Sequence, residues 1–284
     1  MLLRVLIYCI LSSGFFLNVY AKPSLKDLQN ETLSLKAQKV FLIKEPQKLE
    51  FKGKKYKIFI ALSKNYKPNS SLKAFYVLDG NKHFVLLLNG LARLNFRANE
   101  PFIIIGIGYD TSLGYDQMAR KRDYTPKISL EFLQNATNTK TFENSGKEAE
   151  FWEFLQDILL TKINKTYPQI RTQALFGHSF GGLFVLNALL KHPLIFDAYF
   201  IASPSLWWGE GSFLPNKIAL ATCPKIFFLR GKMEKTRGKS SMSLTELHEK
   251  ISKQCEANLK EFAGLSHSEV IPYALIFAFK NFVN

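Results

Sequence analysis

The first part of the chain carries short runs of β-branched and aromatic residues separated by polar turns. Such runs are typical of strands, and the cluster Asn65–Ser70 has the Asn, Pro and Ser of a turn between two of them. No helical pattern lies between the first runs, so we expect them to form an antiparallel edge of a sheet. The strands predicted here are Lys39–Ile43, Lys55–Leu62 and Ala74–Leu78.

From residue 74 onward, predicted strands alternate with predicted helices. The run Phe102–Ile107 is continuously apolar, as expected of a strand buried on both faces. The alternation predicts a three-layer α/β protein, in which helices cover both faces of a mostly parallel sheet. Further strands are predicted at Ala174–Phe176, Ala198–Ala202 and Lys225–Leu229, and helices at Phe84–Leu94, Lys147–Ile163, Leu183–Leu190, Leu244–Phe262 and Ser268–Phe282.

The chain has 284 residues, with no internal repeat and no break in composition that would mark a second domain. This favours one domain over residues 22–284, beginning with a polar tether at 22–38. Residues 110–145 are polar and irregular, and they are longer than a plain connection. We therefore expect a functional loop or partial lid there.

Residues 1–21 have the pattern of a cleaved secretory signal peptide. Arg4 precedes an apolar run, and the stretch ends in Val19-Tyr20-Ala21, as a signal peptidase site requires. The alternative is a membrane anchor, but polar residues interrupt the apolar stretch well before the roughly 20 residues that a spanning helix needs. We expect a soluble, exported protein of the periplasm.

Export changes the interpretation of the three cysteines. Cys9 is lost with the signal peptide, and Cys223 and Cys255 remain. In an oxidising compartment the two can form a disulfide. The alternative is a pair of free, partly buried thiols, and the sequence alone does not choose between them.

The chain is strongly basic, with 38 Lys and Arg against 23 Asp and Glu and a formal net charge of +15. Such a surplus indicates an anionic partner, which can be a nucleic acid, a membrane surface or a charged small molecule. Export argues against nucleic acid, and no nucleic-acid recognition motif is present.

The clearest chemical motif is Gly177-His178-Ser179-Phe180-Gly181-Gly182, between a predicted strand and a predicted helix. G-x-S-x-G in this context is a nucleophile elbow, in which a sharp turn lifts the serine hydroxyl above the sheet. The amide of Phe180 then points to where an oxyanion would form, at a helix N-terminus. The alternative is a chance match, which the flanking strand and helix disfavour.

A serine nucleophile needs a base, and in this motif's chain order the histidine comes last. His267 lies in a loop between predicted helices and is our candidate. His192 ends the elbow helix and His248 lies in an amphipathic helix, so surface or packing roles suit them better. His178 sits beside the serine on the wrong side of the turn, and a structural role is expected.

The acid should follow the carboxyl end of a strand. Glu234 follows the strand Lys225–Leu229 and is the first candidate to orient His267, although a solvated loop glutamate would look the same. Glu210 is the second candidate. Asp197 begins its strand, at the opposite edge of the sheet, and is excluded.

A second oxyanion donor should come from the loop after an earlier strand. Leu78-Asp79-Gly80-Asn81 is such a loop, and the amide of Asn81 is our candidate. Asp79 is a candidate brace for this loop. The alternative is an ordinary β-turn, since Asp-Gly occurs in many turns.

These segments resemble the esterase D-like branch of the α/β-hydrolases, and within it the periplasmic trilactone esterases that hydrolyse ferric enterobactin. The resemblance covers about residues 39–284. It implies Ser179 as nucleophile, His267 as base, and the amides of Phe180 and Asn81 as oxyanion donors. Relatives often carry Gly-Glu-Leu-Glu where this chain has Gly231-Lys232-Met233-Glu234, so the acid can be Glu234 or absent, leaving a Ser-His pair. The blocks that carry the resemblance are Tyr76–Asn81, Arg122–Pro126, Gly177–Gly182 with Ala202–Trp208, and His267.

The implied substrate is an anionic ester, a ferric catecholate siderophore, which suits the basic charge. The resemblance links Arg122 to catecholate binding, and Arg120 and Lys121 lie beside it. Trp207 and Trp208 are candidates for an aromatic wall against catechol rings, with core packing as the alternative. A solvated charged loop is the alternative for the basic run. No metal or organic cofactor is expected, because iron would be cargo on the substrate.

Two other functions fit the same residues. One is a general carboxylesterase, such as a feruloyl-type esterase, or an acyltransferase of the same fold. The other is a carrier that binds a ferric siderophore without cleaving it. Ser179 and His267 together argue against a carrier, and product analysis separates all three.

Overall fold

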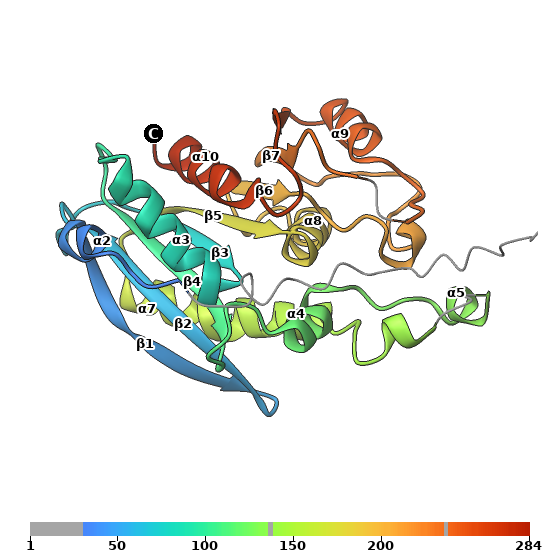
Figure 1. The fold of residues 1–284 in the computed structure, drawn as a ribbon, viewed down its shortest axis with the longest axis horizontal. Coiled ribbons are helices and arrows are strands. Elements are labelled where there is room, and N and C mark those ends of the chain that lie inside the picture. The colour runs from blue at the N-terminus through green and yellow to red at the C-terminus, as the bar shows by residue number, and fades with distance from the viewer. Residues whose placement is uncertain (1–30, 136–138, 236–237) are drawn as a thin grey trace, which may run out of the picture.

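The computed structural model describes residues 31–135, 139–235 and 238–284, so the predicted signal peptide at 1–21 lies outside the described residues. The centre of the protein is a sheet of eight strands with the order β1-β2-β4-β3-β5-β6-β7-β8 (Figure 1). The strands are β1 Phe41–Phe51, β2 Lys54–Ser63, β3 Leu72–Leu78, β4 Phe102–Tyr109, β5 Ile170–His178, β6 Ala198–Ala202, β7 Lys225–Gly231 and β8 Ala257–Phe262.

Helices and short helical turns connect these strands. The α-helices are α2 Leu35–Val40, α3 Gly80–Arg93, α4 Gln117–Tyr124, α5 Leu130–Asn135, α6 Glu148–Glu153, α7 Thr161–Thr166, α8 Phe180–Lys191, α9 Leu244–Ser252 and α10 Ile271–Val283. A π-helical stretch, η2 Phe154–Leu160, joins α6 to α7, and 3₁₀ turns lie at η1 Thr139–Phe142 and η3 Trp208–Gly211.

The two ends of the sheet differ in strand direction. β2 pairs antiparallel with both β1 and β4, whereas every pair from β4 through β3 to β8 is parallel. This confirms both the antiparallel edge and the mostly parallel sheet predicted from the sequence. The strand order, with its single antiparallel corner, is that of the α/β-hydrolase fold.

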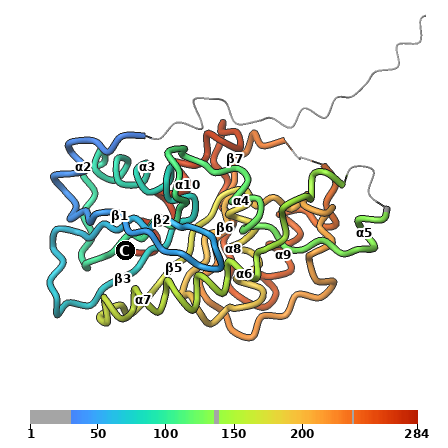
Figure 2. Tube along the Cα trace, turned by 90° about the horizontal axis from the view of Figure 1, so that it is seen from below, coloured from blue at the N-terminus to red at the C-terminus, as the bar shows by residue number. Residues whose placement is uncertain are grey.

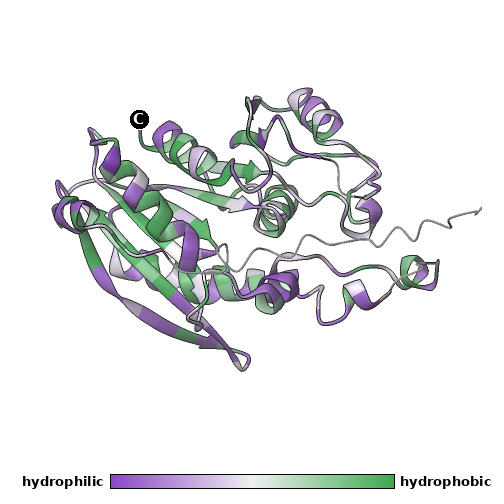
Figure 3. Ribbon diagram, in the orientation of Figure 1, coloured by the Kyte–Doolittle hydropathy of each residue, from purple (hydrophilic) through white to green (hydrophobic). Residues whose placement is uncertain are grey.

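Helices cover both faces of the sheet and create two cores. Alternate residues of β3 divide between them, since Tyr76 joins one cluster and Phe75 the other. The first cluster packs the sheet against α6 to α9, and the second packs it against α2, α3 and α10 (Figure 1). In Figure 3 the central strands are largely hydrophobic, while the edge strand β1 is largely hydrophilic. This is the predicted three-layer arrangement.

The predicted helix Leu244–Phe262 is wrong over its second half. The helix α9 ends at Ser252, and residues 257–262 form β8, which pairs in parallel with β7 at the sheet edge. Because an edge strand packs few residues, β8 carries a weak strand pattern, and the helical spacing of Leu244, Leu247 and Ile251 dominates the sequence around it.

The segment 110–145 is more ordered than its composition indicates. It contains α4, α5 and η1 rather than one irregular loop. Figures 1 and 2 place α5 at the opposite end of the molecule from α2, beyond the carboxyl end of the sheet. The helix α4 packs on α8 and α6, and Phe142 of η1 lies with its ring centroid 4.9 Å from that of Trp208, so both ends of the segment are tied to the body of the protein.

Cys223 and Cys255 form a disulfide, with Cα atoms 5.2 Å apart. The two cysteines directly precede β7 and β8, so the bond joins the amino-terminal ends of neighbouring strands. Within the described ranges, no helix combines the length and the apolar character needed to cross a bilayer.

Candidate active site

Ser179 sits on the turn between β5 and α8, as the motif predicts. Its backbone has φ 59° and ψ −116°, a strained conformation for a residue with a side chain. The turn is held by its amide, which donates to the Ala202 carbonyl at 3.0 Å. A Cβ on Gly177 would lie 2.3 Å from the Gly181 carbonyl oxygen, and one on Gly182 would lie 2.4 Å from that of Ala202. The elbow therefore requires glycine at 177 and 182.

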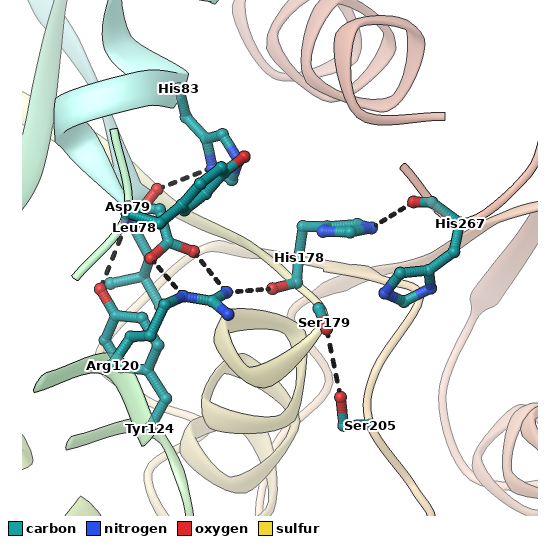
Figure 4. A network of polar contacts seen from close by, with 10 residues as sticks. Leu78, Asp79, His83, Arg120, Tyr124, His178, Ser179, Ser205 and His267 are labelled. Carbon is teal, nitrogen blue, oxygen red and sulfur yellow. Dashed lines mark hydrogen bonds and ion pairs between the residues drawn. The ribbon is translucent and has the colours of Figure 1, made fainter. Parts of the chain in front are cut away.

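His267 lies next to this turn, in the loop between β8 and α10. The ring of His178, the residue before Ser179, is 4.6 Å from the His267 ring between centroids. His178 Nε2 also donates to the His267 carbonyl at 2.8 Å, which anchors the loop (Figure 4). Burial lowers the pKa of His178 well below its usual range, and the nearby His267 and His83 act in the same direction. His178 is therefore a neutral donor.

Glu234 is brought to His267 from the loop after β7. Its Oε2 lies 3.3 Å from His267 Nδ1, while Oε1 accepts bonds from the Gly231 amide at 2.7 Å and from Ser203 Oγ at 2.5 Å. Burial raises the pKa of the Glu234 carboxyl, but these hydrogen bonds outweigh it and leave the pKa below its usual value. A charged carboxylate thus faces Nδ1 and leaves Nε2 of His267 for another partner.

The Ser179 hydroxyl itself is hydrogen-bonded to Ser205 Oγ, at 3.3 Å (Figure 4). Ser203 and Ser205 both follow the carboxyl end of β6 and are almost fully buried. Ser203 supports Glu234 and Ser205 holds Ser179, so each contacts one member of the proposed catalytic set. Neither serine is predicted as a site residue from the motifs, although their place directly after a strand was a usable signal.

The two candidate oxyanion amides both belong to the first turns of helices. Phe180 is the first residue of α8, and Asn81 is the second residue of α3, so neither amide has a carbonyl one turn back. Asn81 is fixed by its side chain, which accepts from the Tyr109 amide at 2.8 Å and donates to the Tyr109 carbonyl at 3.0 Å. Both amides are therefore available to an anion between the two turns.

The three predicted substrate-binding residues differ in how far they are exposed and in what they contact. Arg122 is half-buried and forms a bidentate ion pair with Asp123, with donor–acceptor distances of 2.6 and 2.8 Å. Trp208 is fully buried and donates to the Pro126 carbonyl at 3.1 Å. For this residue the structure therefore matches the core-packing alternative. Trp207 is partly exposed and lies with its ring centroid 5.7 Å from that of Phe180.

The remaining candidates lie elsewhere. His192 stacks on Trp152 at a centroid distance of 4.1 Å, and His248 bonds to the Ala257 carbonyl at 3.0 Å. Glu210 is exposed on η3. Among the described residues no group of His, Cys, Asp and Glu side chains is arranged to hold a metal ion.

The assembled site has the parts of a serine hydrolase at the carboxyl ends of β3, β5, β6, β7 and β8. A hydroxyl on a strained turn, an imidazole with one nitrogen turned to a carboxylate, and two free amides can together support acyl transfer.

Comparison with known proteins places this site in context. The family described as "Putative esterase" matches residues 50–220. The ferri-bacillibactin esterase BesA of Bacillus subtilis is 29% identical over 235 residues, which cover 76% of this chain and 81% of the relative. A siderophore enterobactin esterase of Emericella nidulans is 36% identical over 151 residues, or 51% of this chain and 50% of the relative.

Solved structures agree in fold. The BES protein of Bacillus cereus superposes with a TM-score of 0.69 and 26% identity, covering 84% of this chain and 95% of that protein.

Proposed function

The chain belongs to the "Putative esterase" family, and from that premise we propose that it is a serine esterase that hydrolyses the trilactone backbone of ferric catecholate siderophores such as ferric enterobactin. The single observation that carries the proposal is the meeting of Ser179, His267 and Glu234 from three separate strand ends. Relatives named as siderophore esterases support the choice of substrate.

In the proposed reaction, His267 Nε2 takes the proton of Ser179 Oγ as the oxygen attacks an ester carbonyl. The hydroxyl must first turn from Ser205 toward His267, whose ring packs against that of His178, the residue before the serine. The amides of Phe180 and Asn81 donate to the tetrahedral oxyanion. His267 then gives its proton to the leaving alcohol oxygen, and an acyl-enzyme on Ser179 remains.

Water completes the cycle. His267 again acts as base, water attacks the acyl carbonyl, and the linear acid is released with Ser179 restored. The Glu234 carboxylate fixes the ring through Nδ1 and stabilises the imidazolium that forms in each half-reaction. Its depressed pKa keeps it charged while this happens.

The substrate would be an anion, since six catecholate oxygens outweigh the charge of bound iron(III). The net charge of +15 would raise the rate of encounter with such a ligand. Trp207, partly exposed beside Phe180, is the residue best placed to meet a catechol ring. Iron enters only as cargo on the substrate. We place the enzyme in the periplasm, on the basis of the signal-like residues 1–21 and the disulfide of Cys223 with Cys255.

Substrate comparison tests this proposal. The purified protein is incubated with ferric enterobactin, iron-free enterobactin, p-nitrophenyl butyrate and methyl ferulate, and products are separated by chromatography. We expect linear trimers, dimers or monomers from the trilactone, with a kcat/KM well above that for the simple esters. An intact trilactone alongside rapid cleavage of a simple ester would contradict the proposal and favour a general esterase. An intact trilactone with no ester cleavage would favour a carrier.

A further inference from the structure

We propose that Arg120 is a positioning residue that holds the two backbone oxyanion donors in register with each other, a role that rests on the proposed function. Arg120 lies on α4, between the loop that bears Asn81 and the elbow that bears Phe180. Its guanidinium donates to Asp79 and to the His178 carbonyl rather than to Ser179. Its part is to fix Asp79 on one side and the elbow on the other.

The first contact is a buried ion pair. Arg120 Nε and Nη2 each donate to an Asp79 carboxylate oxygen at 2.8 Å, and the two side chains are 8% and 1% exposed. Such a pair adds little net stability, because desolvation offsets the attraction, and an apolar pair of similar volume would often serve as well. What the bidentate geometry does supply is a fixed direction for Asp79.

Asp79 needs that direction because its backbone is unusual. It has φ 55° and ψ 42°, the left-handed conformation, and directly precedes the first residues of α3. An aspartate that precedes a helix with extended backbone ordinarily turns its carboxylate onto the amides of the helix's first turn. Here the side chain makes no capping bond. Arg120 holds the carboxylate away from those amides, which leaves the Asn81 N–H free for an oxyanion.

The same helix also holds the Asp79 backbone. The Asp79 amide donates to the Tyr124 hydroxyl at 3.2 Å, and Tyr124 lies one turn after Arg120 on α4 (Figure 4). Side chain and main chain of one residue are thus fixed from a single element. This is a second constraint on the loop, independent of the ion pair.

The guanidinium meets the elbow on its other side. Nη2 points to the His178 carbonyl at 3.5 Å, and the Arg120 Cζ atom lies 5.7 Å from the centre of the Phe180 ring. A Cβ on Gly181 would lie 3.5 Å from Asp79 Oδ2, so the carboxylate packs against the first turn of α8. One ion pair therefore spans the gap between the two turns that carry the donors.

The charge of Arg120 is not itself the oxyanion ligand. Burial lowers its pKa, but the charge and hydrogen bonds of Asp79 outweigh this and hold the pKa above its usual range. Both guanidinium donors that face Asp79 are taken up by its carboxylate oxygens. Arg120 must therefore act on catalysis by positioning the two donor turns. Replacing its bidentate guanidinium with the single ammonium group of lysine should impair catalysis even though the positive charge remains.

The experiment compares Arg120→Lys with a matched control, Lys191→Met. Lys191 forms a 2.7 Å pair with the buried Glu148 at the other end of α8, roughly 16 Å away along the helix. For each variant, kcat and KM are measured with p-nitrophenyl butyrate, and affinity is measured for a trifluoromethyl ketone that forms an oxyanion on the serine. Unfolding temperature and end-point labelling by a fluorophosphonate report the folded, competent fraction.

We expect Arg120→Lys to lower kcat at least tenfold with KM within threefold, and to weaken the ketone by the same factor as kcat/KM. The control should lose unfolding temperature and keep kcat and ketone affinity. The proposal is overturned if the kcat of Arg120→Lys stays within twofold of wild type. It is also overturned if the fall in kcat is fully explained by a smaller fraction of protein that the fluorophosphonate labels. Should this variant not fold, Tyr124→Phe tests the same loop, with a kcat loss of about threefold expected and unchanged kcat overturning the proposal.

Ferric enterobactin is assayed in parallel with the same preparations. A wild-type protein that cleaves p-nitrophenyl butyrate and leaves enterobactin intact refutes the proposed substrate, while the comparison of Arg120→Lys with Lys191→Met still decides the role of Arg120.

Discussion

The two sides of the site are built differently. On the nucleophile side, Asp79 and Arg120 are almost completely buried and the turns at Asp79 and Ser179 have strained backbones. On the acid–base side, Glu234 and His267 are 16% and 23% exposed and lie in loops joined by a 3.3 Å contact. The first side is fixed by the fold itself, and the second by a few side-chain contacts at the surface.

The difference separates two requirements of acyl transfer. Stabilising an oxyanion needs donors whose positions do not relax, and buried turns on strand ends supply them. A proton carrier needs an imidazole that can serve the nucleophile and then the leaving group, and a partly exposed loop allows this. We therefore expect changes on the two sides to fail in different ways.

The largest effect should come from removing the base. His267→Ala should lower kcat by roughly 10⁴-fold or more, as for other catalytic histidines, with folding intact because the His178 bond goes to the residue 267 carbonyl. Steady-state kinetics with a simple ester measure this. His178→Gln keeps a donor near that carbonyl and serves as the comparison. A kcat within tenfold of wild type for His267→Ala would assign the base elsewhere.

The disulfide should matter to stability and little to catalysis. Cys223 and Cys255 are 32 residues apart in sequence, and replacing both with Ser should cost about 3–4 kcal/mol of unfolding free energy. The bond lies at the ends of β7 and β8 away from Glu234 and His267, so kcat should stay within about threefold. Urea unfolding measures the loss of stability, and steady-state kinetics measure kcat. A collapse of kcat at unchanged stability would contradict it.

The buried side should be sensitive to acid. His83 lies on α3 close to the Asp79 turn, where its Nδ1 donates to the Leu78 carbonyl at 2.9 Å, and it is fully buried. Burial lowers its pKa to about 4 from the usual 6.5. The folded state holds it neutral, so its contribution to stability is complete above pH 6.5 and is lost as pH falls toward 4, by about 3 kcal/mol. Unfolding free energies at pH 7.5 and 4.5 measure the loss. His83→Gln should show a smaller drop than wild type, and equal drops would refute the assignment.

Glu234→Gln tests whether the acid–base side depends on a charged carboxylate. The amide keeps the shape but removes the charge that stabilises the imidazolium, so kcat should fall roughly 10²-fold. Kinetics at pH 8 measure this. Since the Glu234 pKa is depressed, its charge stabilises the fold above about pH 4.5, and the benefit is lost as pH falls further into acid. Unchanged kcat would indicate a Ser-His pair without an acid.

Much of this was predictable from local patterns. The strand, glycine turn and helix around Ser179 are contiguous in sequence, and chain order then pointed to His267 and Glu234. Because parallel strands end on the same side of a sheet, Ser179, Glu234 and His267 were all expected at the carboxyl ends of the strands. Such features depend on spacing along the chain, which the sequence carries directly.

Other features depend on distances that no local pattern contains. The pairing of Arg120 with Asp79 joins residues 41 apart, and nothing in the basic run distinguishes Arg120 from Arg122. Trp207 and Trp208 are neighbours, yet one is partly exposed and the other fully buried. The strand β8 was missed because it gains its stability from pairing with β7 rather than from its own pattern.

The most direct test of the central claim is chromatography of ferric enterobactin after incubation with wild type and with Ser179→Ala. Ser179 is partly exposed on its turn, so alanine should fit there without loss of folding. We predict ring opening by the wild type and an intact trilactone with Ser179→Ala, whose unfolding temperature should match. Cleavage by Ser179→Ala at the wild-type rate would contradict the account.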